Sequence, residues 1–278
     1  FGGEYGGPLT LRRALMRSAN AATVRLSRAL GEKRVVALAE RSGIRSRMAA
    51  VPALALGAFE VTPLELVAAY APFANGGTRV QPSIVSRIEA ADGSVLWRAA
   101  PDRRERVLER TEAFQITSML QSVVDGGTGR VVRQMGVTGP VAGKTGTTNN
   151  GADVWFIGYT PTLVAGFWFG YDAPRPIASN ASGGRLAAPA WAMFYLDGWH
   201  EESPAGAWNP PPELTRLTID ASNGELANEW CPDTQREWFR SGTEPTSICR
   251  AHHPPFIDQL EELGQKIGKV LGRILKEL

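Results

Sequence analysis

Three short strand-like segments near the middle of the chain constrain its fold more than any other feature. They span residues 141–148, 154–160 and 163–171, and turn-forming residues separate them. Segments of this length and composition predict β-strands, and the two-residue connection Pro161-Thr162 predicts that the last two are antiparallel neighbours. Helical patterns precede and follow these segments. We therefore predict an α+β domain in which helices flank an antiparallel sheet.

The helices predicted around this sheet are recognised by apolar spacing and by residues that start or stop a helix. Residues 62–75 begin with Thr62-Pro63, a capping residue followed by proline in the first helical position. Residues 10–31 form either one helix or two helices joined by a tight turn, because a polar triplet interrupts them. The remaining predicted elements are helices at residues 33–43, 111–125 and 187–199 and a β-hairpin at residues 80–98.

The C-terminal part of the chain differs in composition. Residues 200–256 are rich in Pro, Gly, Asn and Asp, with one short strand-like segment at residues 214–219. Residues 257–278 place apolar side chains along one helical face, which predicts an amphipathic helix that packs on its own domain or on a partner helix. We therefore expect a domain at residues 1–199, an extension at residues 200–256 and a helix at residues 257–278.

The charge of the chain is nearly balanced, with a formal net charge of +2 over 278 residues. This balance does not favour a nucleic acid as partner. No apolar segment reaches the roughly 20 residues that span a bilayer, and there is no signal peptide. The chain starts at Phe1 in a glycine-rich, loop-like stretch, so we expect it to begin within a longer protein. No cofactor is expected.

The two cysteines, Cys231 and Cys249, lie close together in the Pro- and Gly-rich extension. Two cysteines in one local segment fit a small disulfide in an oxidising compartment, and this is the pairing that we predict. A pair of free thiols is the first alternative. A zinc site with His252 and His253 is the second, but its spacing matches no standard zinc pattern, and no metal is predicted.

Lys144-Thr145-Gly146 lies on the first predicted strand and is a rare triplet for a chain of this composition. A lysine ammonium with the hydroxyls of Thr145 and Thr147 on alternating positions suits a carboxylate beside an acyl-transfer centre, because strand positions i and i+2 share a face. Gly146 leaves space for a ligand, and the backbone N–H of Thr147 can donate to an oxyanion. The segment from Lys144 to Thr148 is therefore a candidate substrate-binding strand. The alternative is an ordinary edge strand followed by a turn.

A phosphate-binding loop is excluded, although Gly143-Lys144-Thr145 ends like one. The pattern G-x-x-x-x-G-K-[ST] requires a glycine five residues before Gly143, where Thr138 stands. A P-loop also opens a helix, whereas residues 146–153 lead into the next predicted strand.

Ser18-Ala19-Asn20 is the polar triplet that interrupts the first helical segment. A hydroxyl and an amide displayed together can relay a proton and hold a substrate amide. Ser-x-Asn triplets arise often by chance, so the motif taken alone is explained equally well by a Ser and an Asn at a helix break.

Taken together with other segments, these motifs occur in the order found in a known family. The segments are residues 10–12, 18–20, 55–57, 60–65, 69–77, Gly127-Thr128-Gly129, 142–148, 153–161 and 183–189. The segment at residues 153–161 begins with Asp153-Val154-Trp155-Phe156. Over residues 1–199 the chain resembles the transpeptidase domain of bifunctional, class A penicillin-binding proteins. The segment at residues 242–246, before Cys249, resembles the C-terminal extensions of some members.

This resemblance implies a β-lactamase/transpeptidase-like fold and a peptidoglycan D,D-transpeptidase. In the family a serine attacks the terminal D-Ala-D-Ala of a stem peptide, and an amine takes up the acyl group; β-lactams acylate the same serine. By this resemblance Ser18 relays a proton, Asn20 holds the substrate amide and Lys144 supports the relay electrostatically. Thr145 and Thr147 bind the terminal carboxylate.

The chain departs from the family pattern in one decisive respect, because it contains no Ser-x-x-Lys, the motif that supplies the nucleophile. In the family this motif precedes Ser-x-Asn by several tens of residues, and 17 residues precede Ser18. We therefore expect a fold that is incomplete at its N-terminus and a chain that is inactive on its own. The alternative is a noncatalytic penicillin sensor or scaffold, and a β-lactamase fits the segments less well.

The resemblance also implies a place in the cell and a set of partners. We expect an extracytoplasmic location at the bacterial inner membrane, with a membrane anchor upstream of this chain. The expected partners are peptidoglycan stem peptides, β-lactams and other proteins of cell-wall synthesis, and no nucleic acid.

Overall fold

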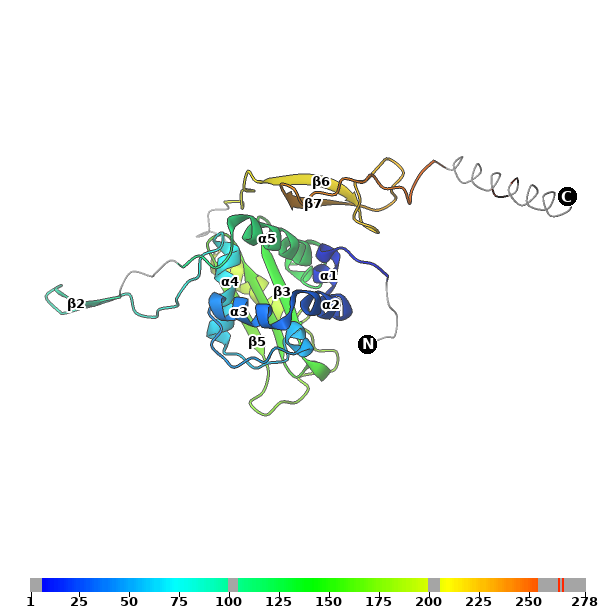
Figure 1. Cartoon of the computed structure of the whole chain (residues 1–278). Helices are drawn as coiled ribbons and strands as arrows, with labels where there is room; N and C mark the ends of the chain where they lie inside the picture. The colour runs from blue at the N-terminus through cyan, green and yellow to red at the C-terminus, as the bar shows by residue number, and fades with distance from the viewer. Residues whose placement is uncertain (1–6, 100–104, 200–205, 255–264, 266, 268–278) are drawn as a thin grey trace. The chain divides into compact units, whose positions relative to one another are not determined.

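The computed structural model describes residues 7–99, 105–199 and 206–254, together with Gln265 and Ile267 (Figure 1). The chain divides into two units. We call Leu11–Pro212 the main unit, and Phe1–Thr10 with Glu213–Leu278 the C-terminal unit. Each unit is described separately below.

A three-stranded antiparallel sheet forms the centre of the main unit, as the sequence predicts. It consists of β3 (Ala142–Thr147), β4 (Val154–Tyr159) and β5 (Val164–Phe169), in the order β3-β4-β5. Short turns join the strands, so each pairs with its neighbour in the chain. Thr145 lies opposite Phe156, and Phe156 lies opposite Phe167.

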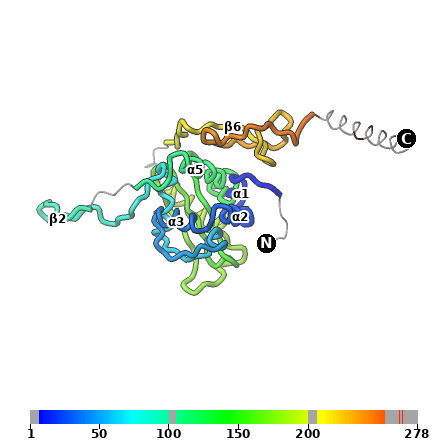
Figure 2. The backbone as a smooth tube through the Cα atoms, viewed as in Figure 1, coloured from blue at the N-terminus to red at the C-terminus, as the bar shows by residue number. Residues whose placement is uncertain are grey.

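The predicted helices of the main unit are present, with one choice resolved, and the short helix α6 was not predicted. Residues 10–31 form two helices joined by a turn (Figure 2), rather than one continuous helix. The predicted cap at Thr62 is present, where Thr62 and Glu65 cap each other at the start of α4. The helices are α1 (Leu11–Arg17), α2 (Asn20–Leu30), α3 (Glu32–Ser42), α4 (Pro63–Ala74), α5 (Arg110–Asp125), α6 (Val131–Gln134) and α7 (Ala187–Phe194), with the short turns η1 (Pro52–Leu56), η2 (Asn149–Gly151) and η3 (Tyr195–Trp199).

Helices pack on both faces of the sheet, which gives the predicted α+β layers. Phe156 and Tyr159 are three residues apart on β4, so their side chains lie on opposite faces. Phe156 packs with α7, and Tyr159 packs with residues of α4 and α5. The larger cluster contains Val124, Val132, Val137, Val141, Phe156, Ala187, Ala188, Trp191, Ala192 and Tyr195.

The hairpin predicted at residues 80–98 is present over residues 87–98 as a separate two-stranded sheet, and residues 80–86 form no strand. Its strands β1 (Arg87–Glu89) and β2 (Val95–Arg98) are short, and all of their residues are exposed. In the described parts of the chain, no helix has both the length and the apolar character needed to cross a bilayer.

The C-terminal unit contains one strand more than the sequence predicts. The expected strand is β6 (Leu214–Asp220), and it pairs antiparallel with β7 (Thr234–Arg240), which was not expected. The sequence of β7, TQREWFR, is mostly polar or charged and lacks the apolar alternation by which strands are recognised. The predicted amphipathic helix at residues 257–278 lies outside the described residues, except for Gln265 and Ile267, which are helical.

Trp191 is the largest fully buried side chain of the main unit. Its Nε1 donates a hydrogen bond to the carbonyl oxygen of Gly158 at 3.1 Å, and its ring stacks on Tyr195 with centroids 5.2 Å apart. A Cβ at Gly158 would lie 2.5 Å from the indole, so a glycine is needed where α7 meets β4.

We predict that Trp191→Ala lowers the free energy of unfolding by about 3–5 kcal/mol, because it leaves a cavity between α7 and the sheet. The matched control is Trp97→Ala, since Trp97 is 46% exposed on β2 and its loss should cost less than about 0.5 kcal/mol. Urea unfolding followed by circular dichroism compares the two. Equal losses of unfolding free energy in the two variants would show that the packing of Trp191 between α7 and the sheet does not stabilise the core.

Candidate functional site

Ser18 lies in the turn between α1 and α2, in a backbone conformation that is unusual for serine. Its φ is 55°, in the left-handed region. The N–H of Ala19 donates to the carbonyl oxygen of Ala14 at 2.8 Å, and the N–H of Ser18 donates to the carbonyl oxygen of Leu15 at 3.2 Å. These two bonds form a Schellman motif, in which glycine normally occupies the position of Ser18. A strained residue with an exposed hydroxyl is typical of a functional position.

Helix α1 is fixed to α5, and this places the turn beside the sheet. The buried guanidinium of Arg12 donates to the hydroxyls of Ser118 and Ser122, both at 2.9 Å. At the end of α1 the backbone comes so close to Gly127 that a Cβ there would lie 2.5 Å from the carbonyl oxygen of Met16. Since α5 packs against β3, these contacts carry Ser18 to the first strand of the sheet.

Lys144 on β3 meets Ser18 directly, although 126 residues separate them in the chain. Its Nζ donates to Ser18 Oγ at 2.9 Å and to the carbonyl oxygen of Thr145 at 2.8 Å. Burial lowers the pKa of Lys144 to about 8, because desolvation disfavours the ammonium. The structure thus brings together residues from the two motifs that sequence analysis selected.

The predicted arrangement of side chains on β3 needs one correction. Thr145 and Thr147 share one face of the strand, as expected, but Lys144 points to the other face with Ala142. The Lys144 ammonium still reaches the site, because it bends to the open edge of β3 and bonds the Thr145 carbonyl there. Alternation therefore explains the shared face of the two threonines, whereas the lysine ammonium reaches the site around the strand edge.

The open edge of β3 also presents backbone N–H groups. The N–H of Thr148 bonds to the carbonyl of Asp153 across the β3–β4 pair. Successive N–H groups of a strand point to alternate sides, so that of Thr147 points away from β4 to the open edge. Its position suits the oxyanion donor that the sequence predicts.

Thr145 and Thr147 are held by residues to which sequence analysis assigned no role in the site. Thr145 Oγ1 lies 2.7 Å from Thr128 Oγ1, and Thr147 Oγ1 accepts a hydrogen bond from the N–H of Gly183 at 3.1 Å. A Cβ at Gly183 would lie 2.2 Å from the carbonyl oxygen of Trp155, so this approach requires glycine. Thr128 and Gly183 belong to the segments 127–129 and 183–189, which carry the family resemblance together with the two motifs. That shared resemblance was the signal in the sequence that could have identified them as site residues.

The other predicted site residues have less specific surroundings. Asn20 is the exposed first residue of α2. A Cβ at Gly146 would lie 3.1 Å from the Cβ of Trp155, its partner on β4, so the glycine leaves room for the Trp155 side chain. Thr148 Oγ1 accepts from the N–H of Asp153 at 2.8 Å, which places Thr148 in the turn after β3 rather than on its face.

Cys231 and Cys249 are free thiols in the structure, which differs from the predicted disulfide. Cys249 is buried and Cys231 is half-buried. Of the two histidines weighed with them, His252 approaches Cys249, and His253 Nδ1 lies 3.3 Å from the carbonyl oxygen of Pro254. These residues belong to the C-terminal unit.

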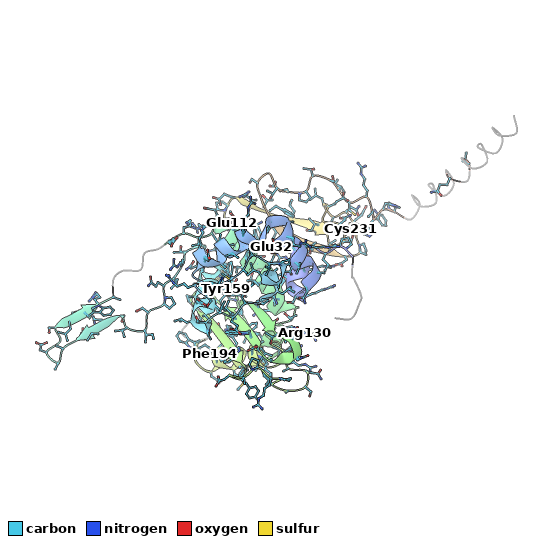
Figure 3. The ribbon with its side chains drawn as sticks, turned by 60° about the horizontal axis from the view of Figure 1, so that its bottom comes forward. Glu32, Glu112, Arg130, Tyr159, Phe194 and Cys231 are labelled. Carbon is cyan, nitrogen blue, oxygen red and sulfur yellow. The ribbon has the colours of Figure 1, made fainter. Side chains whose placement is uncertain are left out.

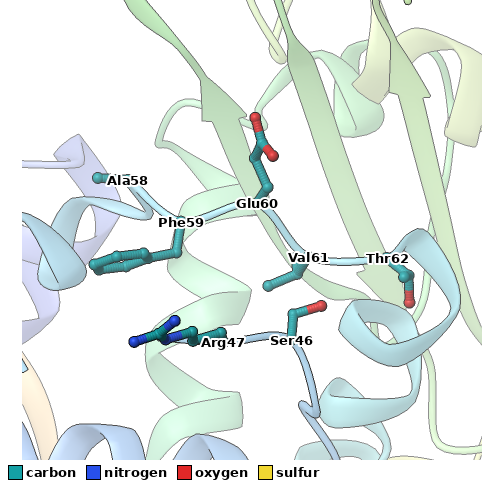
Figure 4. Close-up of a pocket in the computed structure, with 7 residues that line it drawn as sticks. All are labelled: Ser46, Arg47, Ala58, Phe59, Glu60, Val61 and Thr62. Carbon is teal, nitrogen blue, oxygen red and sulfur yellow. The ribbon is translucent and has the colours of Figure 1, made fainter. Parts of the chain in front are cut away.

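A hollow of about 650 Å³ lies elsewhere on the main unit (Figure 4). It is lined by Ser46, Arg47, Ala58, Phe59, Glu60, Val61 and Thr62. None of the predicted site residues lines it, so its size alone does not make it the place of the chemistry.

Comparisons with known proteins show the family to which the chain is similar. Residues 2–192 match the family model of the penicillin binding protein transpeptidase domain, and residues 210–254 match that of the penicillin-binding protein 1A C-terminal domain. Penicillin-binding protein 1A of Aquifex aeolicus is 38% identical over 246 residues, which cover 88% of this chain and 33% of that protein. Penicillin-binding protein 2D of Bacillus subtilis is 36% identical over 262 residues, covering 91% of this chain and 37% of the relative.

A solved structure shows the same fold. The crystal structure of penicillin-binding protein 1A from Haemophilus influenzae superposes with a TM-score of 0.80 at 29% identity and covers 88% of this chain. The match covers 42% of that structure, and this chain spans about a third of the length of the curated relatives above.

We predict that Ser18→Gly is more stable than Ser18→Ala by about 1 kcal/mol, because both variants lose the hydroxyl but glycine alone relieves the left-handed backbone. The matched control is the same pair of substitutions at Ser27, within α2, where alanine should be the more stable by about 0.5–1 kcal/mol. Chemical denaturation measures all four. If the glycine and alanine variants rank in the same order of stability at both positions, the backbone of Ser18 is not strained.

We predict that Lys144 loses its proton near pH 8 in the folded chain, as its lowered pKa requires. The pKa of a lysine in the unfolded chain is about 10.4, which is above that of Lys144 in the folded chain. Between about pH 8 and about pH 10.4 the unfolded state therefore binds more protons than the folded state. Stability should therefore rise with pH from about 8 to about 10.4 through this group. The measurement is the ¹³C signal of reductively methylated lysine, assigned by its loss in Lys144→Arg. A midpoint near 10.4 would show that Lys144 is solvated.

Proposed function

The chain belongs to the penicillin-binding proteins through its transpeptidase domain, and from this membership we propose that it serves a serine D,D-transpeptidase of peptidoglycan synthesis. The substrates would be stem peptides that end in D-Ala-D-Ala, and β-lactams would compete for the same site. This activity belongs to the bacterial cell envelope, outside the cytoplasm, where other proteins of cell-wall synthesis would be its partners.

In the proposed reaction, the hydroxyl of a nucleophilic serine attacks the carbonyl carbon between the two D-Ala residues. An ester bond to the serine forms, the amide bond breaks, and the terminal D-Ala leaves with a proton on its amine. An amine of a neighbouring stem peptide then attacks the ester, and the serine regains its proton. Ser18 would relay protons between serine and amine, and Lys144 would stabilise the charge on this path.

Substrate recognition would fall to the open edge of β3. The hydroxyls of Thr145 and Thr147 would bind the terminal carboxylate, and Asn20 would hold the amide of the stem peptide. The N–H of Thr147 would donate to the oxyanion that forms at the attacked carbonyl. Thr128 and Gly183 would hold the two threonines in place through the hydrogen bonds described above.

The observation that carries this proposal is the 2.9 Å hydrogen bond from Lys144 Nζ to Ser18 Oγ. Each motif taken alone is explained by ordinary local structure. Their convergence places a strained hydroxyl and a partly desolvated amine at the edge strand that carries Thr145 and Thr147. This combination supports proton transfer beside a carboxylate-binding strand.

We propose further that the chain alone does not carry out acyl transfer, because its sequence contains no Ser-x-x-Lys. Incubation with a fluorescent penicillin is expected to leave no adduct that survives denaturation. A stable adduct would show that another nucleophile in the chain reacts and would overturn this part of the proposal.

The transpeptidase role itself is tested in a chimera. Residues 11–212 would replace the matching part of the Aquifex aeolicus relative in its full length, which keeps that protein's own upstream sequence. We expect penicillin acylation in the chimera, slowed about 100-fold or more by Ser18→Ala or Lys144→Met, in line with the loss of general acid–base catalysis. The control is Lys33→Met, an exposed lysine on α3, which should leave the rate unchanged.

A chimera that folds and binds penicillin without acylation would favour the alternative, a noncatalytic sensor or scaffold. Equal rates for Ser18→Ala, Lys144→Met and Lys33→Met would contradict the roles assigned to Ser18 and Lys144. Circular dichroism of each variant shows whether it is folded.

A further inference from the structure

Four side chains with metal-binding chemistry converge in the C-terminal unit. They are Asp220 at the end of β6, Cys231 before β7, and Cys249 and His252 near the end of the described segment (Cys231 is labelled in Figure 3). One ligand atom from each lies within 4.8 Å of all the others. The spacing is Asp-x10-Cys-x17-Cys-x2-His, which sequence analysis did not consider because it paired the cysteines with both histidines.

The distances between these atoms are those of groups that face a common centre. Cys249 Sγ lies 3.5 Å from Asp220 Oδ2 and 3.5 Å from His252 Nδ1, and Nδ1 lies 2.6 Å from Oδ2. Ligands about 2.0–2.3 Å from a tetrahedral ion lie roughly 3.3–3.8 Å apart. Small displacements of the histidine and the aspartate would therefore admit an ion.

N–H groups are directed at both sulfur atoms. The backbone N–H of Asn228 points to Cys231 Sγ, and the side-chain amide of Asn223 points to Cys249 Sγ, each at 3.4 Å. Such donors stabilise thiolates and orient them as ligands. The side-chain amide of Asn228 donates to the carbonyl oxygens of Cys249 and His252, both at 2.8 Å. It therefore holds the segment around Cys231 to the segment that carries Cys249 and His252.

The carboxylate of Asp220 is fully buried, with 0% exposure. Ser222 satisfies its Oδ1 through a backbone N–H at 2.7 Å, while Oδ2 faces His252 and Cys249. A buried carboxylate requires a cation or several donors to offset its desolvation. A divalent cation at the centre of the cluster would meet this requirement.

We propose that Asp220, Cys231, Cys249 and His252 bind one zinc ion. Two thiolates with an imidazole nitrogen and a carboxylate oxygen form a borderline-soft set that suits Zn²⁺ better than Mg²⁺ or Ca²⁺, which prefer oxygen ligands alone. Four protein ligands fill a tetrahedral shell, so the ion would be structural and would leave no open position for a substrate. The proposal replaces the disulfide and the absence of metal that the sequence predicts.

The ion would stabilise a unit with little apolar core. Among its described residues, the buried apolar ones are Leu214, Ile219, Ala221 and Cys249. A two-stranded sheet such as β6–β7 is marginally stable alone in water. A zinc ion joins the end of β6, the start of β7 and the last described segment, and its binding free energy becomes folding free energy.

The test uses the whole 278-residue chain, purified under reducing conditions and then given zinc chloride. We expect one zinc per chain by atomic emission after dialysis, and X-ray absorption with two sulfur ligands at about 2.3 Å. Cys231→Ser, Cys249→Ser, His252→Ala and Asp220→Asn should each weaken binding by more than the roughly 10- to 100-fold typical of losing a ligand's hydrogen-bond partner. The matched control His253→Ala should bind as the parent chain does.

A further measurement keeps the test decisive where a ligand variant fails to fold. Cobalt(II) added to the parent chain should give the visible bands of a tetrahedral ion and the near-ultraviolet absorption of thiolate ligands. Less than stoichiometric zinc, or spectra without sulfur ligands, would overturn the proposal. So would equal losses in His252→Ala and His253→Ala, or a zinc-free chain from an oxidising compartment whose mass shows a Cys231–Cys249 disulfide.

Discussion

The hydrogen bond between Lys144 and Ser18 is the contact on which the rest of the site depends. It requires that a helix turn and an edge strand, far apart in the chain, come within reach of each other. Three features provide this: the left-handed backbone of Ser18, the Arg12 anchor on α5, and the glycine at position 127 that lets α1 approach. Together these features place the Ser18 hydroxyl beside the Lys144 ammonium. The fold of the main unit is thus arranged to present the open edge of β3.

Much of the main unit could be predicted because its elements are local and strongly patterned. The three strands and the cap at Thr62 follow from short-range rules on alternation, turns and helix starts. The place that the Lys144 ammonium reaches could not be inferred from alternation along the strand, because a long side chain can bend around a strand edge. Thr128 and Gly183 were missed as site residues because their role is to support other side chains. That role becomes visible only when distant segments pack together.

The C-terminal unit shows a different limit of prediction. β7 was missed because it is polar and pairs with a single neighbour, so it has no apolar face to reveal it. Sequence analysis weighed His252 with the two cysteines but not Asp220, since Asp220 lies at the end of a strand and carries no signal in the sequence. The two units therefore follow different physical principles. Packing of side chains such as Trp191 and Tyr159 stabilises the main unit, whereas the proposed zinc site would cross-link a unit that has little core.

A double-mutant cycle on Ser18→Ala and Lys144→Met tests the central claim most directly, because it isolates the energy of their contact from the effects of each substitution. Unfolding of the parent chain, the two single variants and the double variant would be measured at pH 7, where Lys144 is mostly charged. A hydrogen bond to a charged group predicts a coupling of about 1.5–3 kcal/mol. A coupling near zero would mean that the two residues do not interact in solution, and the site described here would lose its basis.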